Sequence, residues 1–225
     1  MPRNAFDPPF ERLPSTLPIF PLSGVLLLPR GKLPLNIFEP RYLAMFDDAM
    51  RGDRLVGMIQ PCGEGCSYKA QSGTGPAIFP VGCAGRITSF NETEDGRYLI
   101  TLTGLARFHV RGELPAVKGY RRVQVDWASF KADYQEGAAA PIDRSRLLEL
   151  LQAYFRQQGL SANWDAIESA PDEKLVTSLA MICPFASSEK QALLEATCLR
   201  ERAKVMMALL EIAVATQMDG DDPCH

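Results

Sequence analysis

Few residues in this chain combine the type and the spacing that chemistry requires. Cys62, Cys66 and Cys83 could meet around a zinc ion with one outside ligand, because thiolates are favoured zinc ligands. The first two are separated by three residues rather than the commoner two, and no second pair follows. A glycine-rich loop that happens to carry two thiols explains the same pattern, and we favour that interpretation over a metal site. A Cys-x-x-Cys redox pair is absent.

The usual signatures of catalysis are also missing. Gly31-Lys32 is followed by leucine and has the wrong spacing from the preceding glycine, so it forms no P-loop. Gly73-Thr74-Gly75 lacks the third glycine of a dinucleotide fingerprint, and no Gly-x-Ser-x-Gly elbow occurs. The two histidines are His109, on the polar phase of an expected strand, and His225, the last residue. We therefore expect no enzyme and no cofactor; a small-molecule-binding protein or a cryptic hydrolase is the alternative.

A second set of residues, Phe38, Glu39, Arg41 and Tyr42, suits binding rather than catalysis. They stand where an apolar run turns into a helix, so a fixed arginine and first-turn N–H groups could face a carboxylate or a peptide. In this hypothesis Arg41 holds the carboxylate, and Tyr42 or Phe38 supplies apolar area. The alternative is local: Glu39 caps the helix and Arg41 makes an ion pair with a neighbour.

Basic residues gather further along the chain, and Arg107 is an additional binding candidate among them. The run comprises Arg107, Arg111, Lys118, Arg121 and Arg122. Without exposed aromatic side chains between them, such a run is more typical of a solvated sheet face than of a nucleic-acid surface. The net charge is −3, divided into +3 over residues 1–130 and −6 over residues 131–225. This balance disfavours nucleic acid as a partner.

The elements that must position these residues change character along the chain. The first half holds short apolar runs broken by prolines, which occur at strand starts, edges and bulges. We expect strands at 55–59, 81–90, 98–102, 107–111 and 122–127, with Asp95-Gly96 as a hairpin turn. Alternating polar and apolar residues would bury one face of these strands. Roughly six to eight strands in all favour a small barrel over a parallel sheet.

Helical periodicity appears once in the first half and dominates the second. Pro40 suits the first position of a helix, whose apolar face repeats at Tyr42, Met45, Phe46, Ala49 and Met50. A later helix should start near Pro171-Asp172 and stop before Pro184. Ser188 and Gln191 have the spacing of a capping box for another helix, and the last helix should carry Met206 and Leu210.

The expected fold class is therefore α+β. We divide the chain into a flexible lead-in (1–16), a β-rich part (17–130), a linker (131–141), a helical part (142–218) and a tail (219–225). The six cysteines are scattered and no export signal is recognisable, so free thiols and a cytoplasmic location are expected. No run of about 18 apolar residues occurs, so no membrane association is expected.

Several of these stretches resemble the Lon substrate-binding-domain family. The resemblance begins in the apolar opening, from Leu17-Pro18-Ile19-Phe20-Pro21-Leu22 through Phe38-Glu39-Pro40-Arg41-Tyr42. Further matching stretches follow in order and extend the resemblance over about residues 15–218: Val81–Ile87, Glu94–Tyr98, Gly104–Phe108, Leu193–Glu195 and Arg200–Arg202.

The resemblance implies an antiparallel pseudo-barrel of the PUA-like kind, followed by a helical bundle. It also implies a recognition module that binds peptide or protein segments. In full-length Lon proteases an AAA+ module and a Ser–Lys peptidase follow this domain; neither is found here, so we expect a stand-alone, non-catalytic module. Its implied partners are unfolded or tagged protein segments, together with a protease or chaperone component. RNA binding through the barrel is a third alternative, by analogy of fold alone.

Overall fold

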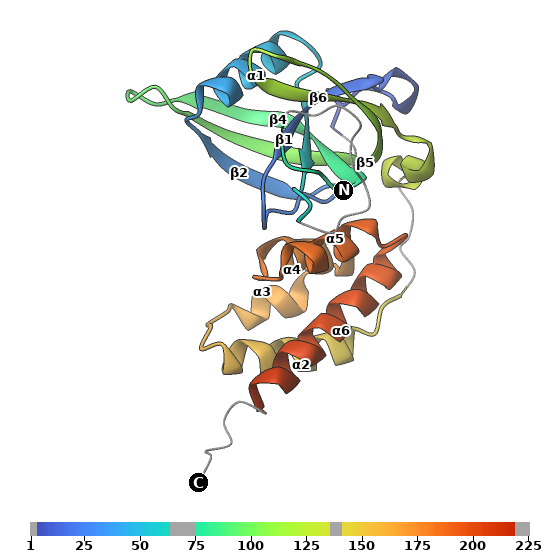
Figure 1. The fold of residues 1–225 in the computed structure, drawn as a ribbon. Coiled ribbons are helices and arrows are strands. Elements are labelled where there is room, and N and C mark those ends of the chain that lie inside the picture. Colours follow the sequence, from blue (N-terminus) through green and yellow to red (C-terminus); the bar gives the residue numbers. More distant parts are fainter. Residues whose placement is uncertain (1–3, 64–74, 136–140, 219–225) are drawn as a thin grey trace. The chain divides into compact units, whose positions relative to one another are not determined.

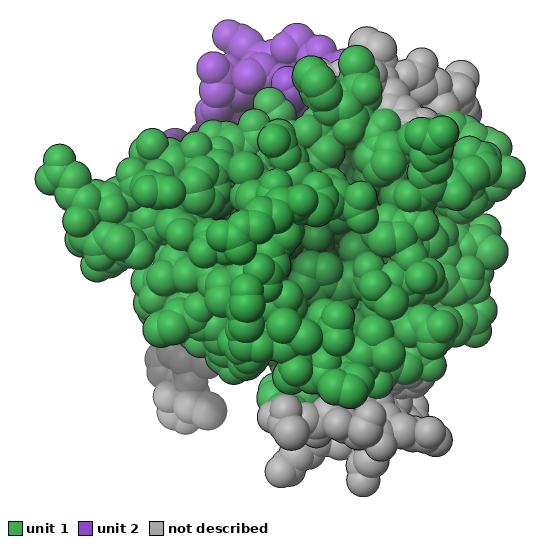
Figure 2. All heavy atoms as spheres, turned by 90° about the horizontal axis from the view of Figure 1, so that it is seen from above, with its two compact units in different colours: residues 1–137, 184–194 green, residues 138–183, 195–225 purple. Residues whose placement is uncertain are grey.

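The computed structural model describes residues 4–63, 75–135 and 141–218. The chain divides into two compact units (Figure 1, Figure 2). Unit 1 comprises Met1–Gly137 and Pro184–Leu194, and unit 2 comprises Ala138–Cys183 and Glu195–His225. All six strands belong to unit 1, and unit 2 is helical. The α+β class is confirmed. The sequence pattern predicts one helical part over 142–218, whereas in the structure Pro184–Leu194 groups with the strands.

Unit 1 is built on one sheet with the strand order β2-β5-β4-β3-β1-β6. Because β5 also pairs with β6, the strands β5, β4, β3, β1 and β6 close into a ring, and β2 lies at the edge beside β5 (Figure 1). The strands are β1 (Thr16–Pro21), β2 (Lys32–Ile37), β3 (Leu55–Ile59), β4 (Val81–Glu92), β5 (Tyr98–Val117) and β6 (Tyr120–Asp126).

One strand pair departs from the antiparallel expectation. β1 runs parallel to β3, with Ile19 opposite Gly57, whereas the other pairs in the sheet are antiparallel. Parallel neighbours require a long crossover connection. Here β2 and helix α1 (Pro40–Arg51) provide it, because both lie between β1 and β3 in the chain.

β5 is a single strand of 20 residues, where the sequence pattern suggested two shorter ones. The chain passes very close to it at Gly104, where an added Cβ would lie 2.0 Å from the carbonyl oxygen of Leu28. Arg30 N–H donates to Gly104 O and Gly104 N–H donates to Gly31 O, each at 2.8 Å. Gly104 therefore lets the segment before β2 cross over β5 without a clash.

The interior of the ring is filled around Phe108. Its ring would collide with a Cβ at Gly57 or at Gly82, at 2.8 and 2.5 Å, so glycine on β3 and β4 makes room for it. Trp127 packs edge-on against Phe108, with ring centroids 5.8 Å apart. The Trp127 indole donates to Pro14 O at 2.9 Å, which satisfies its polar atom at the margin of the core.

Helix α1 packs one face against unit 1, as the sequence pattern predicts. Pro40 occupies the start of the helix, and the buried side chains are Tyr42, Met45, Phe46 and Ala49. Met50 is half-buried. Two acidic residues on its outer surface join it to the strands: Asp47 accepts from the Tyr98 hydroxyl at 2.9 Å, and Asp48 from the Tyr120 hydroxyl at 3.0 Å.

Unit 2 contains helices α2 (Arg144–Gln157), α3 (Trp164–Ser169), α4 (Asp172–Ile182) and α6 (Leu199–Met218). The bounds of α4 agree with the proline-based prediction. α2 and α4 both pack on α6, and the buried side chains include Leu147, Leu151, Leu175 and Leu210. The side chain of Asn163 caps α3 by accepting from Ala166 N–H at 3.0 Å.

Helix α5 (Ser187–Glu195) lies largely in unit 1, where polar side chains attach it to β4 and to the turn after β1. Lys190 Nζ donates to Gly24 O at 2.7 Å, and Gln191 Nε2 donates to Val81 O at 3.1 Å. The predicted capping box of Ser188 and Gln191 is wrong. Gln191 reaches a strand instead, and Glu189 accepts the N–H of Ala186 at 2.7 Å at the start of the helix.

Candidate functional site

Four of the predicted binding residues lie together where β2 ends and α1 begins. Pro40 fixes the first turn of α1. The backbone carbonyl of Glu39 accepts hydrogen bonds from the N–H groups of Tyr42 and Leu43, at 2.9 Å each. The Glu39 side chain makes no capping hydrogen bond. Its carboxylate therefore projects at the helix start and can meet a basic side chain.

That basic side chain is Arg41. Its Nε donates to Glu39 Oε2 at 2.9 Å, and its Nη2 lies 2.8 Å from the same oxygen. The two side chains are 52% and 44% exposed. A pair in this setting contributes about 0–1 kcal/mol to stability. An incoming carboxylate can therefore replace Glu39 at little cost.

The two aromatic residues of this cluster differ in exposure. Phe38 is 64% exposed, whereas Tyr42 is buried against Phe20, with ring centroids 4.3 Å apart. The Arg41 guanidinium lies over the outer face of Tyr42, 4.6 Å from the ring centroid. Burial raises the pKa of the Tyr42 hydroxyl. Phe38 is thus the aromatic side chain that this surface presents, and Tyr42 is the support beneath Arg41.

The edge strand β2 leads directly into this cluster. Gly104 N–H donates to Gly31 O, and antiparallel ladders alternate, so Leu33 and Leu35 turn their backbone groups toward β5. Lys32, Pro34 and Asn36 then turn theirs away from the sheet. Because proline has no N–H, the outer edge of β2 is interrupted in its middle. It can pair with an added strand only in part.

Arg107, the fifth candidate, is far from the surface. Its side chain is 3% exposed and makes two hydrogen bonds to the Asp133 carboxylate, at 2.9 and 2.7 Å. Its Nη1 donates to Leu194 O at 3.0 Å in α5, and its guanidinium lies over the Phe130 ring. In this position Arg107 joins β5 to helix η2 (Ala128–Tyr134) and to α5.

The rest of the basic run is similarly engaged. Arg111 pairs with Asp126, Lys118 with Asp48 and Arg121 with Glu113, and Arg122 donates to Pro115 O. The Arg121–Glu113 pair is largely buried. These residues do not form a stripe of unpaired positive charge, which a nucleic-acid backbone would require.

The cysteine candidates do not come together as a ligand set in the part of the chain that the structure describes. Cys83 is buried in β4, where its thiol donates to Ala84 O at 3.7 Å. Cys62 is disulfide-bonded, so the expectation of a free thiol is wrong for Cys62. Cys66 lies outside the described residues. Among the described residues, no three His, Cys, Asp or Glu side chains are grouped as metal ligands.

His109 lies in β5 and stacks on Phe130, with ring centroids 4.8 Å apart. His225 falls outside the described residues. In residues 4–63, 75–135 and 141–218, no helix is long and apolar enough to cross a membrane.

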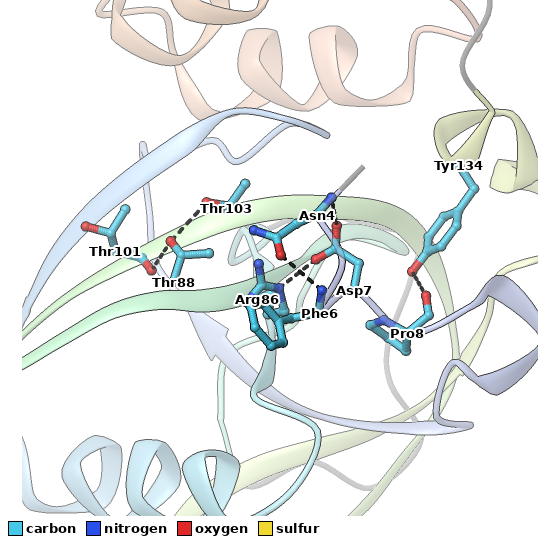
Figure 3. Close-up of polar contacts among 9 residues, drawn as sticks. All are labelled: Asn4, Phe6, Asp7, Pro8, Arg86, Thr88, Thr101, Thr103 and Tyr134. Carbon is cyan, nitrogen blue, oxygen red and sulfur yellow. Dashed lines mark hydrogen bonds and ion pairs between the residues drawn. The ribbon is translucent and has the colours of Figure 1, made fainter. Parts of the chain in front are cut away.

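A cavity of about 490 Å³ on unit 1 was not predicted from the sequence. The most buried of its positively charged side chains is Arg86, whose Nε donates to Asp7 Oδ1 at 2.6 Å (Figure 3). In the sequence, Arg86 is a single charged residue within an otherwise largely apolar predicted strand, and Asp7 lies in the polar lead-in. Their separation of 79 residues leaves no local signal that connects them.

The fold is thus a ring of strands with an edge strand that leads into α1. Known protein families include one with a matching sequence. A family model described as the ATP-dependent protease La (LON) substrate-binding domain matches residues 16–211. The chain belongs to this family.

Known relatives agree with the assignment. Lon protease 2 of Myxococcus xanthus is 28% identical over 204 residues, which cover 89% of this chain and 24% of the relative. Lon protease of Anaeromyxobacter dehalogenans is 26% identical over 204 residues, covering 89% of this chain and 23% of the relative. The chain thus spans about a quarter of the length of these relatives.

Solved structures share the fold. The crystal structure of a Lon N-terminal domain protein from Xanthomonas campestris superposes with a TM-score of 0.58 at 23% identity, covering 86% of this chain and 97% of that one. The N-terminal domain of Mycobacterium avium complex Lon protease gives a TM-score of 0.60 at 14% identity, covering 87% and 98%.

Proposed function

We propose that this protein is a non-catalytic recognition module that binds exposed peptide or protein segments at the start of α1. The observation that carries the proposal is the exposed Phe38 beside the half-exposed Glu39–Arg41 ion pair. Large exposed aromatic side chains next to arginine are typical of binding surfaces. The family supports the same interpretation, since its model describes a substrate-binding domain.

Recognition would combine apolar contact with exchange of an ion pair. An unfolded segment brings an apolar side chain onto Phe38 and a carboxylate to Arg41, where it replaces Glu39. Tyr42 keeps the Arg41 side chain in place, because the guanidinium rests on a ring that is itself packed on Phe20. The surface is prepared before binding, which limits the entropy lost on association.

The edge of β2 offers a smaller contribution. The outward backbone groups of Lys32 and Asn36 could pair with an extended peptide, in the manner of strand addition. Pro34 interrupts that ladder, as prolines on edge strands commonly do to prevent unwanted pairing. We therefore place the main affinity in the side chains at the start of α1.

The proposed partners are unfolded or tagged protein segments, together with a protease or chaperone component that acts on what is bound. The relatives carry the name Lon protease, so a proteolytic context is the natural extension. A cytoplasmic location completes the proposal and rests on the sequence analysis.

The test is a titration of fluorescently labelled casein, a polypeptide without a stable fold, with the full chain. Fluorescence anisotropy reports the dissociation constant. We expect Phe38→Ala and Arg41→Ala each to weaken binding by about tenfold, the size expected when one residue at the centre of an interface is truncated. Thermal unfolding of each variant checks that the fold is intact.

Two matched controls locate the effect. Phe6 is 82% exposed, and Arg97 makes an exposed ion pair with Asp95, so Phe6→Ala and Arg97→Ala remove similar groups elsewhere. We expect both to bind casein like the unmodified chain. Equal binding by all four variants would contradict the proposed surface, and no binding by the unmodified chain would contradict the function.

A further inference from the structure

The cavity on unit 1 lies over the outer face of β2, β4 and β5. Hydroxyl groups cover its floor: Thr88 Oγ1 and Thr103 Oγ1 are hydrogen-bonded at 3.0 Å, and Thr88 also donates to Thr101 O at 3.1 Å (Figure 3). Ser89 and the Thr101 side chain also line it. The volume of about 490 Å³ is within the range of cavities that hold small ligands or a few residues of a peptide.

Positive charge predominates around this floor. Arg30, Lys32 and Arg86 line the cavity, and the carboxylates that line it are those of Asp7 and Asp133. Asp133 is already bound by the two hydrogen bonds from Arg107. Arg30 has a positive φ of 65°, a backbone conformation uncommon for residues other than glycine. Such local strain is often retained where it places a functional side chain.

Arg86 is the central cation of the site. Its side chain is only 9% exposed, and a guanidinium this deeply buried requires a carboxylate partner. The partner does not come from the neighbouring strands. It is Asp7, in the segment that precedes β1, with Nε and Oδ1 2.6 Å apart.

The segment that carries Asp7 is a short hook folded largely on itself. Asn4 N–H donates to Asp7 Oδ2 at 3.2 Å, Phe6 N–H to Asn4 Oδ1 at 3.0 Å and Asp7 N–H to Asn4 O at 3.0 Å. Phe6 points to solvent and is 82% exposed. The ion pair from Asp7 thus attaches the hook to the sheet.

The chain behind the hook is anchored separately. The Tyr134 hydroxyl donates to Pro8 O at 3.3 Å (Figure 3). The ring of Tyr134 packs edge-on against Phe10, with ring centroids 5.4 Å apart. These contacts do not involve Asp7. The hook can therefore release Arg86 while the residues from Pro8 onward stay in place.

We propose that this cavity is a binding site for carboxylate-bearing ligands, and that Asp7 occupies its principal cation, Arg86, until such a ligand displaces it. The ligand's carboxylate takes the place of Asp7 on Arg86. A second anionic or polar group reaches Lys32 and the hydroxyl floor. The site is distinct from the surface at the start of α1 and does not depend on the proposed function.

The experiment titrates glutarate, a small dicarboxylate, into the isotopically labelled full chain and follows amide chemical shifts. Removing a resident competitor raises the apparent affinity by the reciprocal of the fraction of molecules that it had left unblocked. If about nine in ten molecules are blocked, Asp7→Ala, shown by thermal unfolding to be folded, should bind about tenfold more tightly than the unmodified chain. Asp95→Ala is the matched control, since it removes an exposed aspartate that is also paired with arginine. It should leave the affinity unchanged.

Variants of the cations complete the test. Arg86→Gln should abolish the shifts, and Lys32→Gln, at an exposed position, should weaken binding several-fold. If Arg86→Gln fails to fold, Lys32→Gln decides. Equal affinity of Asp7→Ala and the unmodified chain would overturn the proposal, as would unchanged binding in Lys32→Gln.

Two further titrations test which chemical group the cavity binds, a carboxylate or a phosphate, and whether a peptide can supply it. Inorganic phosphate is titrated in the same way, and tighter binding of phosphate than of glutarate would overturn the assignment to carboxylates. The peptide Asn-Ala-Phe-Asp-Pro-Pro, which copies residues 4–9, is compared with its Asp-to-Asn counterpart on the Asp7→Ala chain. Preference for the acidic peptide identifies a peptide carboxylate as an accepted ligand, and equal binding of the two would contradict the role given to Asp7.

Discussion

Two regions of unit 1 each contain an arginine that was predicted from the sequence as a binding residue. The two arginines have opposite environments in the structure. At the start of α1, Arg41 is half-exposed and pairs with Glu39, two residues away. Beside β5, Arg107 is buried and pairs with Asp133, 26 residues away. The first ion pair is local and open to solvent, and the second joins separate elements inside the fold.

The difference shows that the burial of the ion pair and the position of the acidic partner determine whether an arginine stabilises the fold or can bind a ligand. When the partner of a buried charge is removed, the charge stays buried and uncompensated. Loss of the partner therefore destabilises the fold. An exposed pair is screened by water and contributes little to stability. Arg41 is therefore available for recognition, whereas Arg107 holds β5, η2 and α5 together.

The largest effect should follow from Asp133→Ala. It leaves the Arg107 guanidinium buried without its carboxylate, which costs about 3–5 kcal/mol. The free energy of unfolding of unit 1 can be measured by urea titration of a Trp164→Phe background, in which Trp127 reports on unit 1 alone. Asp95→Ala, which breaks an exposed pair with Arg97, is the control. If the free energy of unfolding falls by no more in Asp133→Ala than in the control, the proposed difference between the two regions is wrong.

Tyr42→Ala should have the next largest effect. It removes a buried ring packed on Phe20, and truncating a buried aromatic residue costs about 3–5 kcal/mol, here at the lower end because the ring lies near the surface. Tyr42→Phe keeps the ring and should lose less than about 1 kcal/mol. The same urea titration distinguishes them. Similar stability of the two variants would mean that the ring does not support the start of α1.

A smaller effect should appear as a dependence on pH through Asp48. Hydrogen bonds from Lys118, at 2.6 Å, and Tyr120 lower the pKa of the Asp48 carboxyl. Because this pKa is lower in the folded than in the unfolded chain, the stabilisation is present above the ordinary carboxyl pKa. It is lost as the pH falls through the lowered folded value.

The measurement compares the unfolding free energy of Asp48→Asn with that of the unmodified chain between about pH 6 and pH 2. The variant should show a shallower decline toward acid, and the two should differ by less than about 1 kcal/mol near neutral pH because the pair is partly exposed. Parallel curves over the whole range would show that Asp48 has no such role.

Arg41→Ala should have the smallest effect on stability. The Glu39–Arg41 pair is half-exposed, so its loss should change the unfolding free energy by no more than about 0.5 kcal/mol. A destabilisation as large as that of Asp133→Ala would place Arg41 among the structural residues and would remove the basis for the contrast.

The sequence predicted the local features well, because local chemistry determines them. Pro40 starts α1, and the turn at Asp95-Gly96 forms with Gly96 at a φ of 79°. The capping assignment in α5 failed because Gln191 finds a partner on β4, a tertiary contact that no local pattern contains. The parallel pairing of β1 with β3 was missed for the same reason, since strand order is a long-range property.

The candidate site was predicted in part. Phe38, Glu39 and Arg41 cluster as expected, since they are neighbours in the chain at a helix start. Exposure could not be predicted: Tyr42 and Arg107 turned out to be buried. The pairing of Arg86 with Asp7 depends on a lead-in that folds back across the sheet, and no sequence spacing encodes it.

The most direct test of the account is a map of where an unfolded polypeptide binds. Amide chemical shifts of the labelled full chain are recorded during titration with a casein-derived peptide. The account predicts that the largest changes fall on Phe38, Glu39 and Arg41, and that Arg107 and Leu194 stay unchanged. Changes centred on Arg107 and its neighbours, with none at the start of α1, would contradict it.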